Sequence, residues 1–105
     1  MSKSKYVRVL ISAENSEQAN TILDALLQKK LVAGGMITKG PAKVWWKGKV
    51  VEMEYYNISV LTKEKYKDAV ITNVKQVSVE EVPMIAFFPL EGNVELLEWI
   101  NSSVG

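Results

Sequence analysis

The stretch KVWWKGKVVEMEYY, Lys43 to Tyr56, decides how this chain folds. Residues on both sides of Lys47-Gly48 have the pattern of two extended strands joined by a short turn. Neighbouring side chains on a strand point to opposite faces of the sheet. The stretch therefore places large rings on both faces, because its aromatic residues are adjacent: Trp45 beside Trp46, and Tyr55 beside Tyr56.

The segment before this hairpin predicts a strand and then a helix. Residues 6–13, YVRVLISA, favour a strand because they are rich in Val and Ile. Apolar residues at three-and-four spacing then predict an amphipathic helix, with Asn15 as its N-cap and Gln18 completing a capping box. The helix is expected to end near Lys30, and Gly34-Gly35 is interpreted as chain exit or a strand bend rather than a phosphate loop.

Residue patterns also predict the strands of the hairpin and the elements of the C-terminal half. We expect extended chain from Met36 to Lys47, interrupted near Gly40-Pro41 because proline removes a ladder donor, and a return strand over 50–61. A second helix is expected after the cap Thr62, and its packed face consists of Tyr66, Ala69, Val70, Val74 and Val77. A strand over 84–88 follows. A last helix is expected after the cap Asn93, and its packed residues are Val94, Leu97, Trp99 and Ile100.

This order predicts an α+β, ferredoxin-like β-α-β-β-α-β sandwich with a long hairpin between its second and third strands and a C-terminal helix. Helices in that plan cover one face of the sheet and leave the other open. Exposed rings at Trp45/Trp46, Tyr55/Tyr56 and Phe87/Phe88 would forgo several kcal/mol of burial at roughly 25 cal/mol per Å², and monomers rarely tolerate such patches. We therefore expect the second face to pack against another copy of the chain.

Composition excludes several kinds of chemistry. The 105 residues contain neither cysteine nor histidine, so thiolate metal sites, cysteine nucleophiles and imidazole mechanisms are absent. The hydrophobic fraction is 48% and the charged fraction 24%, which is typical of a single globular domain. The start of the chain lacks the apolar core of a signal peptide, so we expect a cytoplasmic protein with no membrane partner.

A basic segment has two interpretations. Its lysines fall between Asp24 and Glu52 with no acid among them: Lys29, Lys30, Lys39, Lys43, Lys47 and Lys49. With two tryptophans interleaved, they could form a weak nucleic-acid or phosphate surface. The net charge of +1 is too small for strong steering, and lysines on a strand edge also block edge-to-edge pairing. We favour the edge interpretation and expect no nucleic-acid partner.

Two carboxylates are candidate metal ligands. Glu52 and Glu54 share one face of a strand, and their Cα atoms are expected about 6.8 Å apart because a strand rises near 3.4 Å per residue. Such a pair could hold Mg²⁺, Ca²⁺ or Mn²⁺, with Glu80 and Glu81 joining from a loop or a neighbouring subunit. The alternative is the polar side of an ordinary strand. No nucleophile and base can be paired, so we predict no catalytic residues and no enzyme.

The chain resembles the CutA family of divalent-cation tolerance proteins. The resemblance rests on VRVLISAENSEQANTILDALLQKKLVAG, WKGKV, LTKEKY and EVPMIAFFPLEGNVELLEWI, and it implies a single CutA-like domain over residues 1–105. It further implies a homotrimer in which three sheets pack face to face. Related PII signalling trimers share this architecture without the W-x-G-K-V hairpin tip. The interface expected here contains Trp45, Trp46, Tyr55 and Tyr56.

Some family positions are matched and others are not. Trp46, Gly48 and Lys49 match the W-x-G-K motif, Glu52 an acidic position after it, and Glu81 and Pro83 the end of H-P-Y-E-x-P. The chain has Ser78-Val79-Glu80 in place of His-Pro-Tyr, Val44 in place of Tyr, Gly34 and Met36 in place of the Cys and Asn of A-C-V-N, and a PLEGN stretch about one residue shorter than usual. The cysteine and histidine that could take copper are missing.

The expected function follows from this resemblance. It implies a non-enzymatic homotrimer in metal-ion tolerance or response, with a divalent cation or small ligand in clefts between subunits. The expected cleft residues are Trp46, Lys49, Lys63 and Glu81. One alternative is a PII-like sensor of a small molecule or anion that uses the lysines, and another is a trimeric scaffold that docks a further protein.

Overall fold

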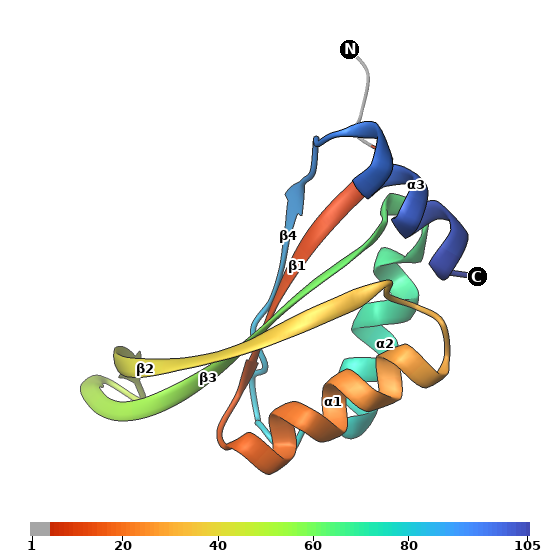
Figure 1. The fold of residues 1–105 in the computed structure, drawn as a ribbon. Helices are drawn as coiled ribbons and strands as arrows, with labels where there is room; N and C mark the ends of the chain where they lie inside the picture. Colours follow the sequence, from red (N-terminus) through yellow and green to blue (C-terminus); the bar gives the residue numbers. More distant parts are fainter. Residues whose placement is uncertain (1–4) are drawn as a thin grey trace.

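A computed structural model describes residues 5–105 (Figure 1). Its elements, in chain order, are β1 (Tyr6–Ala13), α1 (Ser16–Gln28), β2 (Gly34–Trp46), β3 (Lys49–Lys63), the short 3-10 helix η1 (Glu64–Tyr66), α2 (Lys67–Val77), β4 (Ile85–Pro89) and α3 (Val94–Ser103). The four strands form one antiparallel sheet in the order β2-β3-β1-β4. This confirms the ferredoxin-like arrangement with a long hairpin and a terminal helix.

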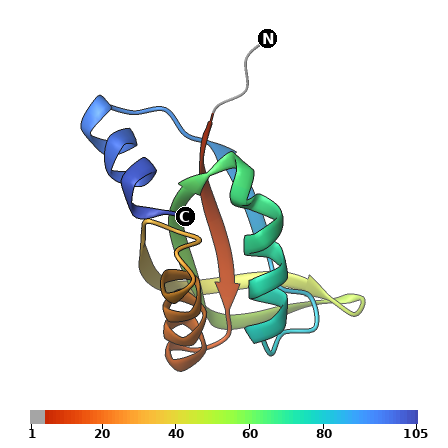
Figure 2. The same cartoon turned by 90° about the vertical axis from the view of Figure 1, so that its right-hand side faces the viewer.

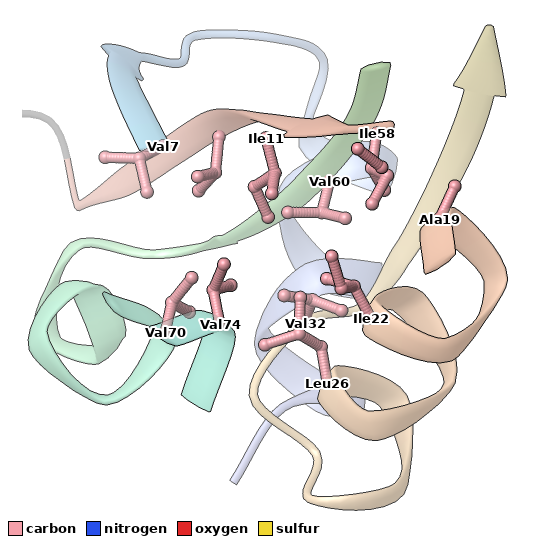
Figure 3. Close-up of a cluster of buried hydrophobic side chains, with 12 residues drawn as sticks. Val7, Ile11, Ala19, Ile22, Leu26, Val32, Ile58, Val60, Val70 and Val74 are labelled. Carbon is pink, nitrogen blue, oxygen red and sulfur yellow. The ribbon is translucent and has the colours of Figure 1, made fainter. Parts of the chain in front are cut away.

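Helices α1 and α2 cover one face of the sheet (Figure 2). The core between them is built from alternate residues of the central strands, including Val9 and Ile11 of β1 and Val60 of β3, each 0% exposed. Ile22, Leu26, Val70 and Val74 close it from the helices (Figure 3). Because the helices lie beside only part of the sheet, the far end of the β2-β3 hairpin extends beyond them (Figure 1).

The hairpin is regular along its whole length. Its register runs without interruption from Gly34 opposite Leu61 to Trp46 opposite Lys49. Lys47 (φ 51°) and Gly48 (φ 85°) both have left-handed backbones, as a two-residue type I′ turn requires, so the predicted turn is confirmed. The expected interruption near Gly40-Pro41 is wrong. β2 is an edge strand, where proline can remain in a ladder because one side of the backbone has no strand partner among residues 5–105.

The predicted cap of α1 is confirmed in part. Asn15 Oδ1 accepts a hydrogen bond from the backbone N–H of Gln18 at 2.8 Å. The side chain of Gln18 does not return to Asn15. Its Oε1 accepts instead from the backbone N–H of Val79 at 2.6 Å, so this side chain ties α1 to the segment that follows α2. The helix ends at Gln28, with Lys30 in the left-handed region at φ 55°.

The predicted cap of the second helix is wrong. Thr62 is fully buried within β3, and its hydroxyl donates to the carbonyl of Leu31 at 2.6 Å. Lys63 precedes the short helix η1, which holds Tyr66, and α2 begins only at Lys67. Ala69 is exposed although the expected apolar stripe includes it, because it lies at the edge of the face that Val70 and Val74 bury.

The last helix packs less of its surface than predicted. Asn93 stands at the N-cap position but makes no capping bond to the backbone, and its Nδ2 donates to Glu95 Oε1 at 3.1 Å. Ile100 is fully buried, whereas Val94 is 64% exposed and lies outside the packed face. The reason is that α3 lies at one end of the sheet, where only part of the helix contacts β3 (Figure 1).

Candidate functional site

The face of the sheet opposite α1 and α2 is largely apolar, and within residues 5–105 much of it remains accessible. The chain itself covers this face at Ser12, where the segment 78–84 lies, and at Gly34, where Trp99 lies. Val9, Val60 and Phe87 lie side by side and face the core, so the next residue along each strand points away from the helices. We call this surface the open face. Its apolar residues are Leu10, Met36, Ala42, Val44, Trp46, Val51, Met53, Leu61, Ala86 and Phe88.

Large side chains of the open face remain accessible in the single chain. Met36 is 66% exposed, Phe88 44%, Trp46 39% and Met53 38%. They come from β2, β3 and β4, so the accessible surface extends across the sheet rather than along one strand. Continuous apolar patches of this kind mark interaction surfaces in most soluble proteins.

One cation lies within this apolar face. Arg8 points to the open face between Leu61 and Phe88, because Val7 and Val9 on either side of it are buried in the core. Its Nε donates to Ser59 Oγ at 2.8 Å, and its Cζ lies 5.7 Å from the centroid of the Phe88 ring. Arg8 is not among the residues predicted for the site, although the alternation of YVRVLIS indicates that it faces away from the core.

The segment between α2 and β4, residues 78–84, is fastened to the open face through Glu80. Ser12 Oγ donates to Glu80 Oε2 at 3.0 Å and accepts from the backbone N–H of Met84 at 2.8 Å. The hydroxyl of Tyr55 donates to the second carboxylate oxygen of Glu80. Burial raises the pKa of Glu80, the Ser12 hydrogen bond opposes this shift, and the nearby Glu14 charge adds to it.

The structure brings together two of the four predicted cleft residues. Trp46 and Lys49 are register partners at the hairpin tip, and Lys47 Nζ lies 5.6 Å from the centroid of the Trp46 ring. Lys63 is at the other end of β3, on the order of 40 Å from Lys49 at about 3.3 Å per residue. Glu81 is exposed in the segment after α2. Only residues of different subunits could therefore combine all four in one cleft.

The predicted metal pair belongs to a cross-strand charge ladder. Lys43 Nζ lies 3.4 Å from Glu52 Oε1, and Lys39 Nζ lies 3.8 Å from Glu54 Oε1. These side chains are well exposed, which makes each pair a weak contributor to stability. Within residues 5–105, no three acidic residues come close enough together to hold a metal ion. A cation at Glu52 and Glu54 therefore remains a prediction, and two of the lysines of the basic segment are neutralised here.

The four predicted interface aromatics divide between the two faces of the sheet. Trp46 and Tyr55 lie on the open face, while Trp45 and Tyr56 lie on the helix side. Tyr56 packs against the core of its own chain. Trp45 is 76% exposed because the hairpin tip lies beyond the helices. Trp46 and Tyr55 are thus the two that lie on the face expected to pack against a partner.

The glycines that follow α1 are the first residues of β2, and both are closely surrounded. A Cβ at Gly35 would lie 2.7 Å from Cδ1 of Leu23 and 2.8 Å from Cγ1 of Val60. A Cβ at Gly34 would lie 2.9 Å from Cη2 of Trp99. Gly34-Gly35 therefore permits close packing of helices on the strand, and its position inside the sheet agrees with excluding a phosphate loop.

A four-stranded ferredoxin-like sheet with a long hairpin and an uncovered apolar face defines a class of small α+β proteins, and comparisons with known proteins identify the family. The profile of the CutA1 divalent ion tolerance proteins matches residues 7–103. The chain belongs to this family. The cation-tolerance protein CutA of Thermus thermophilus is 33% identical over 99 residues, which cover 92% of this chain and 96% of that protein.

Solved structures agree with this assignment. The chain superposes on a structure described as the periplasmic divalent cation tolerance protein CutA from Archaeoglobus fulgidus with a TM-score of 0.92 and 30% identity, covering 95% of this chain and 99% of that one. A rice chloroplastic CutA 1 protein is 30% identical over 97 residues, which make up 90% of this chain and 55% of the rice protein. In residues 5–105, no helix has the length and apolar character to cross a membrane.

Proposed function

We propose that this chain acts in tolerance of, or response to, divalent metal ions as a non-enzymatic homotrimer whose three sheets pack through their open faces. Family membership supports the metal-ion role, because the relatives are named for divalent-cation tolerance. A cytoplasmic location remains a prediction, since the relatives described above include one called chloroplastic and one called periplasmic.

The observation that supports the proposed trimer is the accessible apolar surface of the open face. Met36, Met53 and Phe88 are all more than a third exposed although each belongs to a strand of an ordered sheet. Covering them is favourable by roughly 25 cal/mol for each Å² removed from water. A partner sheet that presents the same face would cover these residues and would also surround Arg8, whose guanidinium could then bind an anionic group at the interface.

Clefts between the subunits are the proposed ligand sites. The hairpin tip carries Trp46 and Lys49, and packing of open faces would bring it near other subunits, which would supply Lys63 and Glu81. Carboxylates are the only charged oxygen ligands that the chain offers, so Mg²⁺, Ca²⁺ or Mn²⁺ are favoured over copper or zinc. Glu52, Glu54 and Glu81 are the proposed cation ligands.

Sedimentation velocity on two matched variants tests the proposed packing. Met53→Glu places a charge in the open face, whereas Lys75→Glu changes the charge of an exposed residue on α2. We expect Met53→Glu to lower the trimer fraction strongly, because burying an unpaired carboxylate is costly, and Lys75→Glu to leave it unchanged. A trimer that survives Met53→Glu at submicromolar concentration would exclude packing through the open face.

The second candidate function is a PII-like sensor of a small anion. It is favoured by the pairing of Trp46 with Lys49, which offers a ring for stacking beside an ammonium that makes no ion pair within residues 5–105. Lys49→Ala combined with Lys63→Ala should then weaken binding of inorganic phosphate or ATP, measured by calorimetry. Unchanged affinity for a probe that does bind would rule out the lysines as its site.

A further inference from the structure

A separate hollow, lined by polar and apolar side chains, lies in the helix layer, on the side of the sheet opposite the open face. Figure 2 shows the helices α1 and α2 that border it. It forms where the end of α1 meets α2 and has a volume of about 390 Å³, which is within the range of small-molecule sites. Its lining residues are Lys29, Leu31, Ala69, Thr72, Asn73 and Gln76. Because packing through the open face leaves this side uncovered, the site would remain accessible in the proposed trimer.

Asn73 is the unusual member of this lining. It is 3% exposed, and its Oδ1 is buried without a hydrogen-bond partner among residues 5–105. Val70 and Val74, its neighbours on α2, are fully buried in the core. Buried acceptors in folded proteins nearly always have a donor. The orphan acceptor indicates a missing N–H or O–H donor.

The rest of the hollow defines what could supply that donor. Lys29 stands at the C-terminal cap of α1 and makes no ion pair within the described part of the chain, so it can take an anion. Leu31 and Ala69 provide apolar contact between the two polar ends. Thr72 and Gln76 are exposed, and exposed side chains change rotamer rapidly, so they can move to admit a group that reaches Asn73.

We propose that this hollow binds a small carboxylate that also carries an N–H or O–H donor, such as an α-amino or α-hydroxy acid. The carboxylate pairs with the ammonium of Lys29, and the donor group hydrogen-bonds to Oδ1 of Asn73. Both groups are needed, because each alone satisfies only one end of the site. The proposal does not depend on the trimer or on the cation role, since none of its residues belongs to the open face or to the hairpin.

Titration of the isotope-labelled full chain, followed by amide NMR, tests the site with L-alanine and L-lactate as probes. We expect chemical shift changes centred on Lys29, Thr72 and Asn73, with dissociation constants in about the millimolar range. Acetate and methylammonium, which each carry half of the recognised chemistry, should bind at least roughly tenfold more weakly, a difference of about 1.4 kcal/mol.

Variants separate the proposed contacts from general effects. Asn73→Leu should abolish the shifts, and Lys29→Gln should weaken binding roughly tenfold, whereas Lys75→Gln on the exposed side of α2 should bind as the unmodified protein does. If Asn73→Leu does not fold, the binding affinity of Lys29→Gln alone tests the proposed site. The proposal is overturned if neither probe shifts these amides at about 50 mM, far above the expected constants, if acetate binds equally well, or if Lys29→Gln binds unchanged.

Discussion

The ring of Trp99 in α3 lies directly against the backbone of Gly34, the first residue of β2. A Cβ at Gly34 would lie 2.9 Å from Cη2 and 3.3 Å from Cζ2 of this ring, closer than side chains pack in folded proteins. Gly34 stands where the family that this chain resembles has a cysteine. The indole occupies the volume that a larger side chain at this position would need.

Gly34→Ala should therefore destabilise the protein by about 1–3 kcal/mol, because the added methyl overpacks the contact with Trp99. Urea unfolding measures this change. Gly40→Ala on the same strand is the matched control, since within residues 5–105 no atom beyond its chain neighbours lies within 4 Å of a Cβ there. Adding Trp99→Leu should recover part of the loss in a double-mutant cycle. Equal effects of the two alanine substitutions would contradict this packing relationship.

Ser12→Ala should destabilise the chain by about 1–3 kcal/mol, because it removes the acceptor of the Met84 N–H and the donor to Glu80. Chemical denaturation measures the difference, and Ser16→Ala, at an exposed position, is the control. The loosened segment 78–84 should also exchange its amide hydrogens faster. Unchanged stability and exchange would mean that Ser12 does not fasten this segment.

The stability of the protein should depend on pH through Glu80. Burial raises the pKa of its carboxyl in the folded chain, so between the ordinary glutamate pKa and this raised value the folded state binds more protons than the unfolded state. The contribution of Glu80 is then most favourable at acid pH and falls as pH rises through that window. Relative to Glu80→Gln, which does not titrate, the unmodified protein should lose stability over this interval, and a parallel pH profile of the two would contradict the assignment.

Cation binding requires the proposed carboxylates. Glu52→Gln combined with Glu81→Gln should abolish any rise in melting temperature caused by Mg²⁺, Ca²⁺ or Mn²⁺, because a bound ion stabilises the folded state by mass action. Each of the two substitutions removes one negative charge. Glu98→Gln, at an exposed position on α3, removes the same charge and is the control for either substitution made alone. A cation-induced rise that persists in the double variant would exclude these two ligands.

Patterns carried by neighbouring residues were sufficient to predict most of the fold. Asn15 caps α1 because its side chain acts on a backbone N–H three residues away, and the turn at Lys47-Gly48 follows from local backbone preferences. The order of strands and helices also follows from local periodicity. These features depend little on where the rest of the chain lies.

The predictions that failed depend on distant contacts. Thr62 resembles a helix cap in sequence, but its hydroxyl is used by Leu31 on another segment. Pro41 remains in a regular ladder because β2 lies at the sheet edge. The link from Ser12 to Glu80 likewise joins residues far apart in sequence, so no local pattern could reveal it.

The mass of the protein in solution tests the central claim most directly. Light scattering on a size-exclusion column, at micromolar and submicromolar concentration and with or without EDTA, gives this mass without labelling. Three chains of 11.8 kDa each, stable to dilution and unaffected by EDTA, are the predicted result. A monomer at both concentrations would contradict packing through the open face and the ligand clefts that depend on it.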